Sequence, residues 1–299
     1  MSYDLYFYKR KENKLTEQEF ANYLTKTIRF NNSEFERQWD YENPETGVYF
    51  LIDWNDPNTE QEEIEIWDSF AEFDNTNFSC SINFFRPQYF GLEVFPIIER
   101  IADELDLYIL NPQNFDEVEM PKKFPKQYLE AQWTEHNDQV SEEHFNEMSF
   151  NFMSPEKSNG MWWFNLHRTE LQESLIEDIF VPGLFVIKSN DDEQLYTACV
   201  WLEHIPIILP QVDYVIIKKK YKKLFKIVEE DGLVPYANII NKLGVFFEEF
   251  SYAGQNLKVL RQNNADKMTA EFNALKIISS VKDFGSGVKL DKFVNVKPD

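Results

Sequence analysis

Apolar and polar positions alternate in short runs along the first 112 residues of the chain. Runs of this kind, bounded by turn-forming residues, are typical of strands. They predict strands at residues 3–8, 38–41, 48–54, 77–84 and 107–110. Thr16 and Glu19 have the spacing of a capping box before a helix, and a second helical stripe runs from Val94 to Leu105. The order β-α-β-β-β-α-β favours a mostly antiparallel sheet with two helices on one face.

The pattern changes after residue 112. Three prolines, Pro112, Pro121 and Pro125, interrupt a stretch without periodicity, which predicts a linker at residues 113–126. A polar helix is expected at residues 128–146. Farther along, the pattern predicts helices at residues 169–178, 233–243 and 268–275. It predicts strands at residues 162–166, 184–188, 195–201, 214–217 and 290–296.

These elements predict an α+β fold with mixed, mostly antiparallel sheets, helices packed on them and two subdomains. A chain of 299 residues is long enough for a second core. We therefore expect an acidic domain at residues 1–112 and a second α+β domain at residues 127–299, joined by the linker.

Composition and charge then exclude whole classes of protein. The chain has 52 acidic and 30 basic residues, a formal net charge of -22, so it is not expected to bind nucleic acid. An aromatic fraction of 16% separates it from disordered acidic chains. It shows neither a leader pattern nor an apolar run as long as a membrane span, which predicts a cytoplasmic protein without membrane contact. Cys80 and Cys199 lie far apart in strand-like runs and are expected to be buried free thiols.

The negative charge is concentrated in one half of the sequence. Residues 1–150 hold 32 acidic and 12 basic residues, a balance of -20, and the remainder is close to neutral at -2. A general effect on solubility would spread over both halves. The asymmetry instead favours an acidic face that attracts a basic partner, although a solvated surface without a partner would have the same composition.

The densest acidic stretch covers residues 53–65. A calcium loop would need glycine at its sixth position and glutamate at its twelfth, and this stretch has Asn58 and Ile64 there, so no metal site is predicted. Two interpretations remain, a solvated loop and a partner-facing surface flanked by aromatic anchors. The candidate partner-binding residues are Asp53, Trp54, Asp56, Glu60, Glu62, Glu63, Glu65 and Trp67.

Motifs for catalysis and cofactor binding are missing from the sequence. There is no nucleophile elbow, only 9 glycines are available for phosphate loops, and the four histidines have no zinc-type spacing. No catalytic residue, cofactor or metal ligand is therefore predicted. The basic run at residues 218–223 is interpreted as the solvated start of a helix that continues through Val228.

Two other function classes stay open. One is an enzyme with a motif-less site between the two domains, assembled from dispersed residues such as His167, Glu170, His204 and Asp213. The other is a structural or regulatory adaptor that docks through the helix at residues 128–146.

In general character the chain resembles the immunity proteins that bacteria keep in the cytoplasm against polymorphic or contact-delivered toxins. It shares with them an acidic, aromatic-rich composition, an α+β pattern and the lack of catalytic motifs. The resemblance rests on these properties alone, so it assigns no residues. It implies a non-enzymatic, stoichiometric inhibitor that occludes a basic protein partner, which is the function that we hypothesise from the sequence.

Overall fold

The structure is a computed structural model, and it describes residues 1–113, 120–175, 178–203, 205–223 and 226–298. The chain forms two compact units. The first unit comprises Met1–Phe150 together with Phe293–Asp299, and the second comprises Asn151–Lys292. Each unit combines helices with sheets whose strand pairs are mostly antiparallel, so the predicted α+β fold is confirmed.

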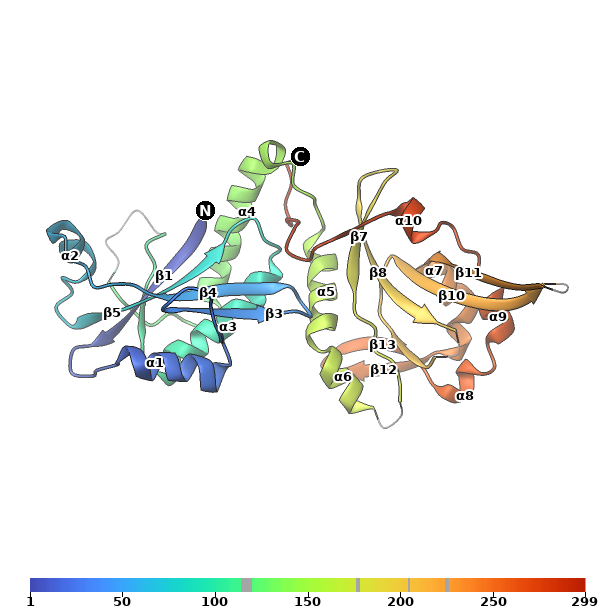
Figure 1. Cartoon of the computed structure of the whole chain (residues 1–299), viewed down its shortest axis with the longest axis horizontal. Helices are drawn as coiled ribbons and strands as arrows, with labels where there is room; N and C mark the ends of the chain where they lie inside the picture. The colour runs from blue at the N-terminus through green and yellow to red at the C-terminus, as the bar shows by residue number, and fades with distance from the viewer. Residues whose placement is uncertain (114–119, 176–177, 204, 224–225, 299) are drawn as a thin grey trace. The chain divides into compact units, whose positions relative to one another are not determined.

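The first unit is built on a six-stranded sheet with the order β2-β3-β4-β5-β1-β6, in which every pair is antiparallel (Figure 1). Its strands are β1 (Ser2–Arg10), β2 (Asn31–Asn32), β3 (Gln38–Asn43), β4 (Val48–Trp54), β5 (Phe73–Asn83) and β6 (Tyr108–Leu110). Its helices are α1 (Glu17–Tyr23), a π-helical turn (Leu24–Ile28), α2 (Gln61–Trp67), α3 (Tyr89–Glu104) and α4 (Tyr128–Met148). Thr16 and Glu19 form the predicted capping box.

The two faces of this sheet differ sharply in burial. The residues of the inner face carry large apolar side chains that are almost completely buried, among them Leu5, Trp39, Phe50, Ile52 and Cys80. The residues between them along each strand point the other way, and most of them are half-buried or exposed; Tyr8 and Ser79 are buried. This alternation is the one expected of an antiparallel sheet with its main core on one side. A smaller hydrophobic cluster around Tyr8, Phe73 and Leu110 includes Tyr6 and Trp67.

Helix α4 belongs to the core of the first unit. Trp133 on α4 is completely buried and lies 6.3 Å from Phe95 of α3, measured between ring centroids. Gly91 of α3 faces it so closely that an added Cβ would lie 2.8 Å from the indole. The units therefore divide at residue 150 instead of at residues 113–126, because the tryptophan pairs the polar helix with the first sheet's helices.

The last residues of the chain also pack into the first unit. Phe293 and Val294 are fully buried, and the side-chain oxygen of Asn295 accepts a hydrogen bond of 2.6 Å from the backbone N–H of Gln88. A strand was expected at residues 290–296, but the described residues of this segment form none. Val294 forms an isolated β-bridge and no longer ladder, and the apolar side chains of the segment fill the first unit's core. The alternation of apolar and polar residues cannot distinguish this role from a strand.

The second unit contains a five-stranded and a three-stranded sheet, with the orders β11-β10-β8-β7-β14 and β12-β13-β9. Its strands are β7 (Phe185–Ser189), β8 (Leu195–Leu202), β9 (Ile207–Leu209), β10 (Tyr214–Lys223), β11 (Lys226–Pro235), β12 (Glu248–Tyr252), β13 (Gln255–Leu260) and β14 (Gly285–Val288). Its helices are α5 (Pro155–Leu166), α6 (Arg168–Ser174), α7 (Tyr236–Leu243), a 3-10 turn (Gly244–Phe246), α8 (Gln262–Ala265), α9 (Thr269–Asn273) and α10 (Val281–Phe284).

Three predicted elements of the second unit differ from the structure. Residues 233–235, expected to begin a helix, end strand β11, and α7 begins at Tyr236. Residues 162–166 lie in helix α5 and not in a strand, because a short apolar run fits either structure and Pro155 favours a helix start upstream of it. The basic run at residues 218–223 continues strand β10 and pairs with β11 instead of beginning a helix.

Both cysteines are buried in sheets, and burial raises the pKa of the Cys80 and Cys199 thiols. Only the thiolate reacts with disulfide reagents. We therefore expect no reaction with Ellman's reagent in the native protein and two equivalents of released thiolate after unfolding in guanidinium. Rapid release at neutral pH without denaturant would contradict the burial of these residues.

Candidate functional site

The acidic stretch at residues 53–65 is partly helical, since its second half forms α2. Glu60 stands at the N-cap position, and Glu62 and Glu63 lie in the first turn, where carboxylates interact favourably with the helix dipole. All three side chains are exposed and make no ion pair with a described residue. Glu65 is also exposed and accepts a hydrogen bond from Gln61. The helix therefore presents an uncompensated negative surface.

The two tryptophans predicted as anchors are packed against the protein. Trp67 lies 4.9 Å from Tyr6 between ring centroids, and its backbone carbonyl accepts a hydrogen bond of 2.9 Å from Tyr8. Trp54 is covered by the guanidinium of Arg37, 4.2 Å from the ring centroid. Both side chains thus hold the acidic stretch in place, and neither projects freely from it.

Asp53 and Asp56 stand at the end of β4, with different partners. Asp53 accepts a hydrogen bond of 2.7 Å from the amide of Gln38, whereas Asp56 pairs with Arg37 at 2.7 Å and remains highly exposed. The negative charge of Asp56 is therefore partly offset, and that of Asp53 is not.

Asp53 belongs to a larger set of residues that the structure brings together. We call this set the outer sheet face: Asp4, Tyr6, Gln38, Asp40, Leu51, Asp53, Ser79 and Ser81. In one row across the sheet, Asp40 pairs with Leu51, Leu51 with Ser81 and Ser81 with Asp4. In the next row, Gln38 pairs with Asp53, Asp53 with Ser79 and Ser79 with Tyr6.

Neutral groups hold the three carboxylates of the outer sheet face. Asp4 accepts hydrogen bonds from the hydroxyls of Ser2 at 3.0 Å and Ser81 at 2.7 Å. Asp40 accepts one from Asn31 at 3.3 Å. These bonds fix the side chains without cancelling their charge, and no lysine or arginine occupies a position in the two rows.

The negative charge of these aspartates contributes to the pKa values of two neighbouring side chains, Tyr6 and Cys80. The pKa of the Tyr6 hydroxyl is raised, mainly by burial and additionally by the charge on Asp4. The pKa of the Cys80 thiol on the inner face is raised mainly by burial, with contributions from Asp4 and Asp53. Both contributions have the sign expected of negative charge beside an acidic group.

Sequence reasoning found Asp53 but missed Asp4, Asp40 and Leu51. The period-2 alternation of the strands was visible in the sequence and separates their two faces. The sequence did not reveal the strand register, because register depends on pairing between segments distant along the chain. This register puts Asp40 beside Leu51 and Ser81 beside Asp4.

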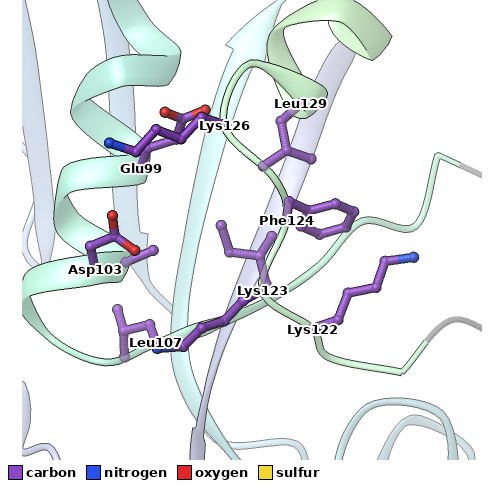
Figure 2. A pocket seen from close by; sticks show the side chains of 10 residues that line it. Glu99, Asp103, Leu107, Lys122, Lys123, Phe124, Lys126 and Leu129 are labelled. Carbon is purple, nitrogen blue, oxygen red and sulfur yellow. The ribbon is translucent and has the colours of Figure 1, made fainter.

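A separate pocket of about 120 Å³ lies between α3 and residues 122–129 in the first unit (Figure 2). Its lining mixes apolar with charged side chains: Glu99, Ala102, Asp103, Leu107, Ile109, Lys122, Lys123, Phe124, Lys126 and Leu129. Glu99 accepts a hydrogen bond from the backbone of Gln127, and Lys123 pairs with Asp106 at 2.6 Å. Lys122 points away from the other charged groups (Figure 2). The charged groups therefore do not converge on one ligand atom.

The residues of the dispersed enzyme hypothesis have structural partners where they are described. Asp213 accepts hydrogen bonds of 2.9 Å from Lys157 and 2.7 Å from the backbone of Thr197. His167 stacks on Trp163, and Glu170 accepts a hydrogen bond of 3.1 Å from Tyr252. His204 lies outside the described residues. These contacts assemble no nucleophile with a base.

Two lysines of the basic run of β10 are paired with the neighbouring strand. Lys219 and Lys220 form ion pairs with Glu230 at 3.3 Å and Glu229 at 2.6 Å on β11. Lys219 is almost completely buried and also donates to two backbone carbonyls. These ion pairs offset the positive charge of Lys219 and Lys220.

The described residues include no cluster of three or more histidine, cysteine, aspartate or glutamate side chains arranged to hold a metal ion. Among the described helices, none has both the length and the apolar character needed to cross a membrane. The chain matches no protein-family model, and neither a curated protein nor a solved structure shows significant similarity to it.

Proposed function

We propose that the protein is a non-enzymatic, acidic binding protein whose first unit occludes a basic protein partner, as a cytoplasmic immunity or antitoxin-type inhibitor does. The distribution of charge between the units carries this proposal. The first unit has 33 acidic and 13 basic residues, whereas the second has 19 and 17. A net charge of -20 on one compact unit accelerates encounter with a positively charged protein.

Carboxylates without an ion pair support the same function. The glutamates of α2 and the aspartates of the outer sheet face have no cationic partner within the described part of the chain. A carboxylate that is not neutralised by a lysine or arginine of its own chain can interact with the positive charge of a partner. An inhibitor that occludes a basic partner would use such a surface and would need no catalytic group.

The test of this function starts with the partner. Affinity purification of the full chain from its native cell, with the neighbouring gene's product as the first candidate, is expected to give a basic protein in a one-to-one complex. The association rate constant should fall steeply between about 0.05 M and about 0.5 M salt, because the Debye length shrinks over that range. A salt-insensitive complex, or a partner without excess positive charge, would contradict the proposal.

The α2 glutamates are expected to act on the approach of the partner. Replacing Glu60, Glu62, Glu63 and Glu65 with glutamine should slow association severalfold and flatten its salt dependence, because exposed charges mainly steer encounter. Stopped-flow association with the purified partner measures both quantities. Unchanged rates at low salt would remove these residues from the proposed surface.

A further inference from the structure

We infer that the outer sheet face is the docking surface for the partner, and that it takes an arginine-rich or lysine-rich protein surface. This inference rests on the proposed function and adds the location of contact. The first unit offers two acidic surfaces, the helix α2 and the outer sheet face. They differ in how rigidly the carboxylates are held.

The aspartates of the outer sheet face are held in a fixed array. Each is a short side chain on a strand inside the sheet, and each accepts a hydrogen bond from a neutral side chain. Asp40 and Asp4 stand at the two ends of one row, about 14 Å apart over three strand spacings. Asp40 and Asp53 are diagonal neighbours, at about 7–8 Å. Binding would therefore cost little ordering of these groups.

The centre of this array is apolar. Leu51 is half-buried between Asp40 and Ser81 in the row and is flanked along its own strand by Asp53. An apolar centre surrounded by polar groups is the usual anatomy of a protein interface. The opposite side of the same strands forms the buried core, so the array has a rigid support.

The negative charge of the outer sheet face favours a positively charged protein as its binding partner. A second copy of the chain would bring an equally negative face, and nucleic acid would be repelled in the same way. The described residues include no group of three or more acidic, histidine or cysteine side chains that could hold a metal ion. Guanidinium groups fit best, because they bind single carboxylates with two parallel hydrogen bonds.

Two triple variants with the same change in net charge separate docking from general attraction. One replaces Asp4, Asp40 and Asp53 with asparagine, and the other replaces Glu62, Glu63 and Glu65 with glutamine. The probe is a fluorescein-labelled nona-arginine peptide, mixed with the full chain in a stopped-flow instrument at low salt. The sheet variant is expected to raise the dissociation rate constant about tenfold, whereas the helix variant lowers only the association rate constant.

A second pair of variants keeps the test valid if the triple variant of Asp4, Asp40 and Asp53 does not fold. Leu51→Lys adds one positive charge at the centre of the face, and Leu202→Lys adds the same charge on a partly exposed strand position in the second unit. Only Leu51→Lys should speed dissociation of the peptide. Circular dichroism and thermal unfolding verify that both variants fold.

The outcomes distinguish this inference from the proposed function. Equal effects of the two triple variants on the dissociation rate constant, or equal effects of Leu51→Lys and Leu202→Lys, would overturn the outer sheet face as the docking surface and leave the acidic attraction standing. No binding of the peptide by the unaltered protein at low salt would overturn both.

Discussion

Replacing Phe293 with alanine is expected to lower the free energy of unfolding of the first unit by about 3–5 kcal/mol, the usual cost of removing a buried phenylalanine ring. The ring is 1% exposed and lies 6.4 Å from Tyr89 of α3 between centroids. Hydrogen exchange with mass spectrometry locates the effect. Peptides from residues 1–150 should lose protection, although Phe293 directly follows the second unit along the chain.

A matched control exists in the same unit. Phe35 is 71% exposed, so Phe35→Ala makes the same chemical change without opening a cavity and should alter stability by less than about 0.5 kcal/mol. Loss of protection confined to residues 151–292 in the Phe293→Ala protein would contradict the assignment of the last residues to the first unit.

The second large effect is expected at the contact between α3 and α4. Trp133→Ala removes a completely buried indole that packs on Phe95 and over Gly91. We expect a loss of about 3–5 kcal/mol from the free energy of unfolding of the first unit, because two helices cannot close over a cavity of this size. Urea denaturation gives the loss, and hydrogen exchange should place it in α3 and the sheet beneath it.

Gln139→Ala on the same helix is the control for Trp133→Ala. Gln139 is exposed, and alanine favours a helix, so stability should change by less than about 0.5 kcal/mol. If Trp133→Ala weakened protection only within residues 151–292, α4 would belong to the second unit.

Local patterns in the sequence predicted much of the first unit. The capping box at Thr16 and Glu19, the hairpin of β3 and β4 and the stripe of α3 all appear where expected, because each depends on residues a few positions apart. The acidic stretch was expected to be a loop, and its second half forms α2. Glutamate has good helix propensity, and Trp67 holds the end of this helix against Tyr6.

The candidate site depended on contacts that no local pattern contains. Asp4 and Ser81 are 77 positions apart along the chain and share a hydrogen bond only because β1 pairs with β5. The packing of Phe293 near Tyr89 spans an even longer separation. Charge asymmetry pointed to the correct unit for an acidic surface, but strand register decided which carboxylates lie together.

The return of the chain to the first unit at Phe293 has a consequence for its synthesis. Residues 1–150 leave the ribosome first, yet the core that they build lacks Phe293 and Val294 until residues 151–292 have been added. At roughly 5–20 residues per second, that interval lasts about 7–30 s. When this interval ends, the second unit has all of its residues, whereas the first still exposes the apolar surface that Phe293 will cover. The unit that is synthesised first is therefore the last to be completed.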